Sequence, residues 1–133
     1  EEFIKGRELE CAVLGTDNPF ASEVGEILSC NDFYDYDAKY ILGTSGLNIP
    51  ANIPKEASLE IRETAVKAFK ALGCFGLSRV DFFLADNGKV YLNELNTMPG
   101  FTSISMYPKL MENLGIPYGE LLDRLIKLAY ERN

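Results

Sequence analysis

The sequence predicts an α+β fold in which an antiparallel sheet is flanked by helices. Segments with the alternation and composition of strands follow one another across short turns, which favours antiparallel pairing. One long amphipathic helix and two C-terminal helical segments supply the helices. With 133 residues, 47% of them hydrophobic, the chain is long enough to bury the core of one domain.

The N-terminal part is expected to form strands. Residues 1–4 and 7–15 should pair across a turn at Lys5-Gly6, and residues 23–30 should add a third antiparallel strand, which gives a meander. Residues 31–54 show neither helical nor strand periodicity and are interrupted by glycine and proline, so we expect a loop. A loop this long in a compact domain is usually functional or disordered.

A helix is predicted from Pro54, which suits a first-turn position, to Gly73, which is placed for a left-handed cap. Its buried face is expected to contain Ile61, Ala65, Ala68, Phe69 and Leu72.

Residues 76–85 and 89–95 are predicted to be strands joined through Asp86-Asn87-Gly88, with Asn87-Gly88 as a two-residue type I′ turn. Residues 105–115 and 117–132 are predicted to form two helices with apolar faces.

Composition excludes several classes of function. A net charge of −7 and a pI near 4.6 argue against nucleic-acid binding. No long apolar stretch or basic leader predicts a membrane span or secretion, so a cytoplasmic location is expected. Histidine is absent, which removes serine–histidine and cysteine–histidine nucleophiles and makes a zinc site improbable. The three cysteines have no CxxC spacing and are interpreted as reduced thiols.

The predicted hairpin brings charged residues together. If Asn87-Gly88 form the turn, Asp81 lies opposite Glu94 and Arg79 lies opposite Asn96, all on one face. Two opposed carboxylates repel, so a cation is expected between them, and carboxylate and amide oxygens suit Mg²⁺. The alternative is that Arg79 simply neutralises the carboxylates in a surface network.

The same register places Phe83 opposite Leu92 on this face. Beside a metal–phosphate site this apolar pair could support a purine ring, although plain core packing is the commoner meaning.

The segments GLSRVDFFL, YLNELNTMPGFTSISMYPKL and FYDYDAKY resemble motifs of the ATP-grasp ligases and, within them, of the D-alanine–D-alanine ligase family. The resemblance extends from Glu1 to the C-terminal helix. It implies that residues 1–133 are the C-terminal part of an ATP-grasp domain. The N-terminal substrate domain and the first part of the ATP-binding domain would then be absent, in keeping with the abrupt start of the sequence.

The resemblance also implies an activity, namely ATP- and Mg²⁺-dependent ligation of two D-alanines through an acyl phosphate, for peptidoglycan synthesis. The fragment alone would be inactive, and the full-length enzyme could be a homodimer. D-Ala-D-Ser synthesis, another ATP-grasp carboxylate–amine ligation and a noncatalytic nucleotide-binding or interaction module remain as alternatives. Magnesium-dependent ATP binding separates a ligase half-site from an interaction module.

The resemblance assigns catalytic and metal-binding roles. Asp81, Glu94 and Asn96 would bind two Mg²⁺ ions, for which Mn²⁺ could substitute. Arg79 and the backbone N–H of Gly100 would stabilise the developing oxyanion. In the same interpretation Ser105 binds the carboxylate of the second amino acid, although a plain N-cap serine is compatible with the sequence.

The remaining assignments concern the nucleotide and a lid. Glu1 would bind the exocyclic amine of adenine, Phe3 and Ile4 would surround the ring together with Phe83 and Leu92, and Glu8 would bind the ribose hydroxyls. Residues 31–48 resemble an active-site lid. In that lid Lys39 would contact the γ-phosphate and Tyr40 would attach the closed loop to the N-terminal domain.

Overall fold

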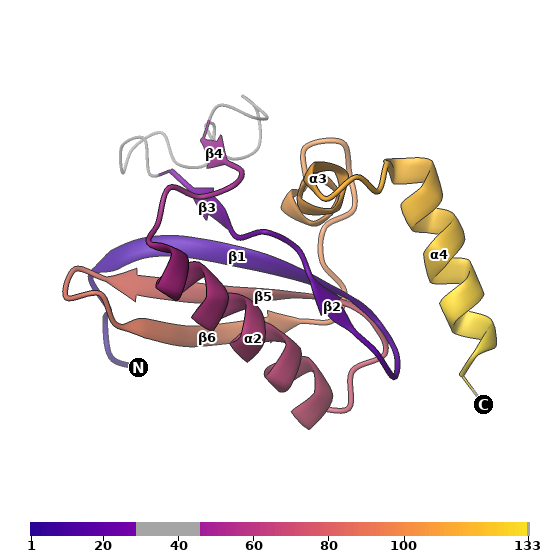
Figure 1. Cartoon of the computed structure of the whole chain (residues 1–133), viewed down its shortest axis with the longest axis horizontal. Coiled ribbons are helices and arrows are strands. Elements are labelled where there is room, and N and C mark those ends of the chain that lie inside the picture. Colours follow the sequence, from indigo (N-terminus) through magenta and orange to yellow (C-terminus); the bar gives the residue numbers. More distant parts are fainter. Residues whose placement is uncertain (29–45, 133) are drawn as a thin grey trace.

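The computed structural model describes residues 1–28 and 46–132, and these form a six-stranded antiparallel sheet with helices on both faces (Figure 1). The strands are β1 (Gly6–Gly15), β2 (Phe20–Ala21), β3 (Gly25–Ile27), β4 (Leu47–Asn48), β5 (Gly76–Ala85) and β6 (Val90–Asn96). The helices are α2 (Lys55–Ala71), α3 (Met106–Asn113) and α4 (Tyr118–Tyr130). The strand order is β4-β3-β1-β5-β6, with β2 paired to β1. The predicted fold class is confirmed.

Strand β1 is central to the sheet and is covered on both faces along its second half. Leu9, Cys11 and Val13 face α2, whereas Ala12 and Leu14 face α3 and α4. All five side chains are almost fully buried. Because successive side chains in a strand alternate between faces, this single strand contributes to two separate cores.

Helix α2 packs across one face of the sheet (Figure 1). Its buried side chains, Ala57, Ile61, Ala65 and Phe69, follow the expected helical spacing. Gly73 has φ of 67°, the left-handed conformation predicted for the residue after the helix. The prediction that Leu72 is buried was wrong, since the helix ends at Ala71 and the Leu72 side chain is exposed.

Helices α3 and α4 form the second core on the opposite face. Tyr107 is fully buried, and its hydroxyl donates a hydrogen bond to the backbone oxygen of Val13 at 2.9 Å. Phe101, in the segment before α3, lies with its ring centroid 5.9 Å from Tyr107 and 5.3 Å from Tyr118. These contacts fix the start of α3 against the sheet. None of the helices within the described ranges combines the length and hydrophobicity needed to cross a bilayer.

The N-terminal predictions need correction. Residues 1–5 are not a strand, so there is no hairpin at Lys5-Gly6. The physical reason is that β1 pairs with β5 along its whole length and with β3 at Glu8–Glu10, so its edges are occupied. Of the predicted third strand, residues 23–30, Gly25–Ile27 forms a strand and pairs antiparallel with β1, whereas residues 29–30 lie outside the described part of the chain. Within the predicted loop, Leu47–Asn48 forms β4 and pairs with β3.

The turn between β5 and β6 also differs from the prediction. A type I′ turn needs positive φ at both central residues, but Asn87 is not in that region and Gly88, at 86°, is. Instead Gly88 N–H donates to the oxygen of Ala85 and Ala85 N–H donates to that of Lys89, which makes a three-residue loop. The first pairs are therefore shifted by one residue, and a bulge between Asp81 and Phe82 reverses the shift.

We predict that Tyr107→Phe lowers the free energy of unfolding by about 1 kcal/mol, because the buried oxygen of Val13 loses its side-chain donor. Chemical denaturation of the purified chain measures this change. Tyr118→Phe is the matched control, since its hydroxyl also donates to a backbone oxygen at 2.9 Å, that of Phe101, but at an exposed position. Equal losses in the two variants would contradict a special contribution from the buried bond.

Candidate active site

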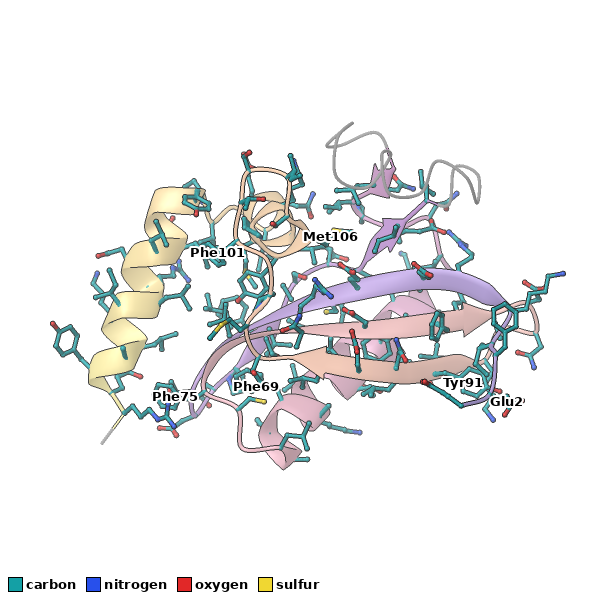
Figure 2. All side chains as sticks on the ribbon, turned by 180° about the vertical axis from the view of Figure 1, so that it is seen from behind. Glu2, Phe69, Phe75, Tyr91, Phe101 and Met106 are labelled. Atoms are coloured by element: carbon teal, nitrogen blue, oxygen red, sulfur yellow. The ribbon has the colours of Figure 1, made fainter. Side chains whose placement is uncertain are left out.

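Three carboxylates form a row across the face of the sheet opposite α2. Glu10 on β1 lies opposite Asp81 on β5, and Asp81 lies opposite Glu94 on β6. In the adjacent row Arg79 lies opposite Asn96. Both cross-strand pairs predicted from the sequence are therefore confirmed. Figure 2 views the sheet from this side, with α2 behind the strands.

Arg79 lies between two of these carboxylates. Its Nε and Nη2 donate to the two carboxylate oxygens of Asp81 at 2.8 Å each, and its Nε lies 3.5 Å from Oε1 of Glu10. The hydrogen bonds to Asp81, together with the charges of Glu10 and Glu94, raise the pKa of Arg79 above its ordinary value. Arg79 thus neutralises Asp81 directly, as the alternative interpretation of the cluster expected.

The donor set suits a metal ion that shares its ligands with a phosphate. Within residues 1–28 and 46–132 no three acidic or cysteine side chains are close enough to form a complete metal site. Asp81 directs both oxygens at Arg79, and Oδ1 of Asn96 accepts a hydrogen bond from the N–H of Met98 at 3.0 Å. Glu94 is exposed. Mg²⁺ commonly takes one or two carboxylates and completes its shell with phosphate and water, so these residues fit such a shared site.

An open cleft of about 840 Å³ adjoins the acidic row. Five of the residues assigned to the nucleotide line it: Glu1, Phe3, Ile4, Glu8 and Phe83. Glu94 lines it as well, and so connects the cleft with the row of carboxylates. Residues from the N-terminal segment, β1, β5 and β6 therefore meet at one hollow, although Glu1 and Glu94 are 93 positions apart in the sequence.

Leu92 is not part of this cleft. The shifted register places Leu92 opposite Phe82 and places Tyr91 opposite Phe83. Phe82 packs in the core beneath α2, and residues opposite each other share a face, so Leu92 belongs to the α2 side. The predicted Phe83–Leu92 pair was wrong because the turn has three residues instead of two.

Gly100 and Ser105 lie close together in the segment between β6 and α3. Ser105 occupies the N-cap position, but its side chain makes no capping hydrogen bond. Its oxygen instead accepts a hydrogen bond from the N–H of Thr102 at 3.0 Å and lies 2.9 Å from the Thr102 hydroxyl. A Cβ at Gly100 would lie 2.9 Å from the Ser105 oxygen, closer than such atoms normally approach.

The sequence interpretation missed Glu10. The segment RELEC contains the signal that could have found it, because Glu8 and Glu10 are two positions apart and therefore share a face of β1. Lys39, Tyr40 and all but the last three residues of the predicted lid, 31–48, lie outside the described residues.

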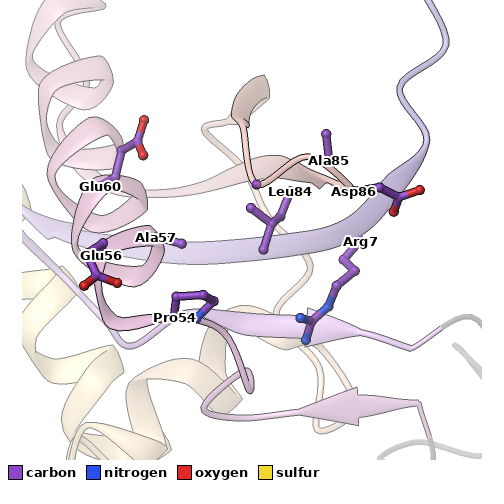
Figure 3. A pocket seen from close by; sticks show the side chains of 9 residues that line it. Arg7, Pro54, Glu56, Ala57, Glu60, Leu84, Ala85 and Asp86 are labelled. Atoms are coloured by element: carbon purple, nitrogen blue, oxygen red, sulfur yellow. The ribbon is translucent and has the colours of Figure 1, made fainter.

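A second hollow lies on the α2 side of the sheet (Figure 3). Its volume is about 430 Å³, and it is lined by Arg7 from β1, Pro54 and Glu60 from the region of α2, and Asp86 from the turn after β5. Arg7 is already bound to both oxygens of Glu26 at 2.7 Å. No residue assigned to the site from the sequence lines this hollow.

A comparison with models of known protein families shows to which family the chain belongs. Residues 1–127 match the family model described as D-ala D-ala ligase C-terminus. The chain belongs to this family. The resemblance on which the site assignments rest is thereby supported over nearly the whole chain.

Individual members of the family agree with this result. A D-alanine--D-alanine ligase from Acetivibrio thermocellus is 65% identical over 99% of the chain, which spans 35% of that protein. The VanG D-Ala:D-Ser ligase from Enterococcus faecalis is 48% identical with a TM-score of 0.80, over 96% of this chain and 37% of that one. A D-alanine--D-alanine ligase from Bacillus anthracis, complexed with ATP, is 28% identical with a TM-score of 0.79, over 98% and 40%. The chain thus spans about a third of the length of its relatives.

We predict that Gly100→Ala destabilises the chain by about 1 kcal/mol, because the added methyl group displaces the Ser105 oxygen from its hydrogen bond with the N–H of Thr102. Thermal or chemical denaturation measures the loss. In a Ser105→Ala background the nearest atom would be Cβ of residue 105, at 3.5 Å from the new methyl, an ordinary contact. The cost of Gly100→Ala should therefore be smaller there, and an equal cost in both backgrounds would contradict the clash.

Proposed function

We propose that this chain is the C-terminal part of an ATP-grasp ligase that joins two D-alanines into D-Ala-D-Ala, and that the chain alone is inactive. The observation that carries the proposal is the opposed pair Asp81–Glu94 together with Arg79. These residues lie beside the cleft that is lined by the residues assigned to nucleotide binding. Membership in the D-ala D-ala ligase family supports the choice of reaction. Dipeptide formation of this kind would serve peptidoglycan synthesis in the cytoplasm.

In this proposal the cleft binds ATP. Glu1 accepts a hydrogen bond from the adenine amine, Phe3, Ile4 and Phe83 contact the ring, and Glu8 accepts hydrogen bonds from the ribose hydroxyls. The cleft volume of about 840 Å³ is sufficient for a nucleotide, and Glu94 lies at the side where the phosphates would meet the acidic row. The ATP complex of the Bacillus anthracis relative supports this use of the fold.

The acidic row supplies the groups for phosphoryl transfer. Asp81, Glu94 and Asn96 would hold two Mg²⁺ ions, or Mn²⁺, which neutralise the phosphate charge and orient the transferred group. Arg79 binds a phosphoryl or carboxyl oxygen through its planar donors. The carboxylate of the first D-alanine takes the γ-phosphoryl group of ATP, and the amine of the second attacks the resulting acyl phosphate and releases phosphate. This route needs no protein nucleophile, which suits a chain without histidine.

The segment between β6 and α3 would bind the second D-alanine. The N–H of Gly100 donates to the developing oxyanion, and the Ser105 hydroxyl donates to the substrate carboxylate. The close approach of Gly100 to Ser105 supports this pairing, because it brings both donors to one place. Lys39 and Tyr40 are proposed, on the resemblance alone, to contact the γ-phosphate and to attach a lid to the N-terminal domain. A homodimer of the full-length enzyme is part of the same proposal.

The D-Ala-D-Ser reaction is the second candidate. It is a candidate because the chain is 48% identical to the VanG D-Ala:D-Ser ligase. The 65% identity to a D-alanine--D-alanine ligase keeps D-alanine as the first choice. The dipeptides formed by the full-length enzyme from equal concentrations of D-alanine and D-serine, separated by chromatography, distinguish the two.

We predict that Glu94→Gln in the full-length enzyme lowers ligation by more than the roughly 10–100-fold that loss of a metal's outer-shell partner costs, because a direct ligand is lost. Phosphate release and dipeptide formation measure the activity. The melting temperature should stay the same or rise, since one of two opposed negative charges is removed.

Glu63→Gln is the control, because Glu63 is exposed on α2 at the opposite face of the sheet. Full activity of Glu94→Gln at ordinary Mg²⁺ concentrations would refute the metal assignment.

A further inference from the structure

Glu10 is a buried acidic residue for which the proposed function gives no role. It is 6% exposed and lies on the same face as Asp81 and Glu94, one strand further into the sheet. Arg79 lies 3.5 Å from its carboxylate and is bound more closely by Asp81. One arginine side chain therefore serves two carboxylates of the same row.

The arrangement creates a competition for Asp81. Both oxygens of Asp81 accept hydrogen bonds from Arg79. A metal ion bound by Asp81 would share the carboxylate with Arg79, and the repulsion between the two cations would weaken the interaction that fixes Arg79. A partly buried cation then gains from another anionic partner, because an uncompensated charge away from water is unfavourable.

Glu10 is placed to be that partner. Its position on the central strand β1 is fixed by pairing on both sides, and its side chain is already within ion-pair distance of Arg79. Arg79 remains charged at any working pH, because a guanidinium group is not deprotonated in proteins. A short shift of the guanidinium toward Glu10 would free Asp81 and keep Arg79 in the site.

We propose that Glu10 is a positioning residue that holds Arg79 on the sheet while Asp81 binds the metal ion. The proposal rests on the proposed metal-dependent ligase function. Glu10 acts through Arg79 and touches neither substrate nor metal. The contribution of Glu10 to metal binding should therefore depend on the presence of Arg79. A general effect of Glu10 on folding would not depend on Arg79.

Glu10→Gln in the full-length enzyme tests this proposal. The amide keeps the shape of the side chain but not its charge, so Arg79 should remain on Asp81 and compete with the metal. We expect weaker Mn²⁺ binding in the presence of ADP, followed by electron paramagnetic resonance, with a dissociation constant raised on the order of tenfold. Glu10→Asp, which keeps the charge on a shorter side chain, should bind Mn²⁺ more tightly than Glu10→Gln.

Glu23→Gln is the control. Glu23 also forms an ion pair with an arginine, Arg62 of α2, at 3.6 Å, but it does not line the cleft. This variant should keep its Mn²⁺ affinity. A parallel loss of Mn²⁺ affinity in Glu23→Gln would show a general structural effect and overturn the proposal.

A double-mutant cycle supplies the second test. In an Arg79→Gln background, Glu10→Gln should change Mn²⁺ affinity much less than in the wild type. An equal effect in both backgrounds would overturn the proposal, because Glu10 would then act on the metal without Arg79. If the wild type itself does not bind Mn²⁺ with ADP, the proposed function fails. If the wild type and Glu10→Gln bind Mn²⁺ equally well, only the proposed role of Glu10 is overturned, and the proposed function stands.

Discussion

The register of β5 against β6 determines which side chains can form the site. A slip of one residue moves every side chain of a strand to the other face. The three-residue loop after Ala85 introduces such a slip, and the bulge at Asp81/Phe82 removes it again. As a result Val90 lies opposite Leu84 in the α2 core, while Asp81 still meets Glu94 in the order that the site needs. The bulge thus allows one hairpin to place apolar side chains in the α2 core and charged side chains in the polar site.

Strand β1 makes the complementary contribution from the centre of the sheet. Its residues facing α2 are apolar at Leu9, Cys11 and Val13, so this face forms one continuous core. On the other face, Ala12 and Leu14 pack with α3 and α4, but Glu8 and Glu10 precede them. Helices can cover only the apolar half of that face without burying unpaired charges. The remaining half is where the cleft and the acidic row lie.

The sequence was sufficient for features that depend on local pattern. The span of α2 and the glycine that follows it, the two C-terminal helices and the pairs Asp81–Glu94 and Arg79–Asn96 are all as predicted. The errors concern features that depend on which strands pair and in which register. Residues 1–5 find no strand partner in the described sheet, and Leu92 changes face because the conformation of Asn87 differs from a type I′ turn. Glu10 could not be assigned before it was known that β1 pairs with β5, since its neighbours in the site are about 70 positions away.

Electrostatic balance links these features to chemistry. Among the described residues, three carboxylates in one row, Glu10, Asp81 and Glu94, lie around Arg79, so this group carries more negative than positive charge. Like charges in adjacent strands repel, which makes the arrangement unfavourable by itself. The excess of negative charge is what a divalent cation requires from its ligands. The same excess weakens the sheet when no metal is bound, and the two apolar cores on either side of β1 offset that loss. The stability of the fold therefore resides in the cores, which leaves the acidic row available for binding.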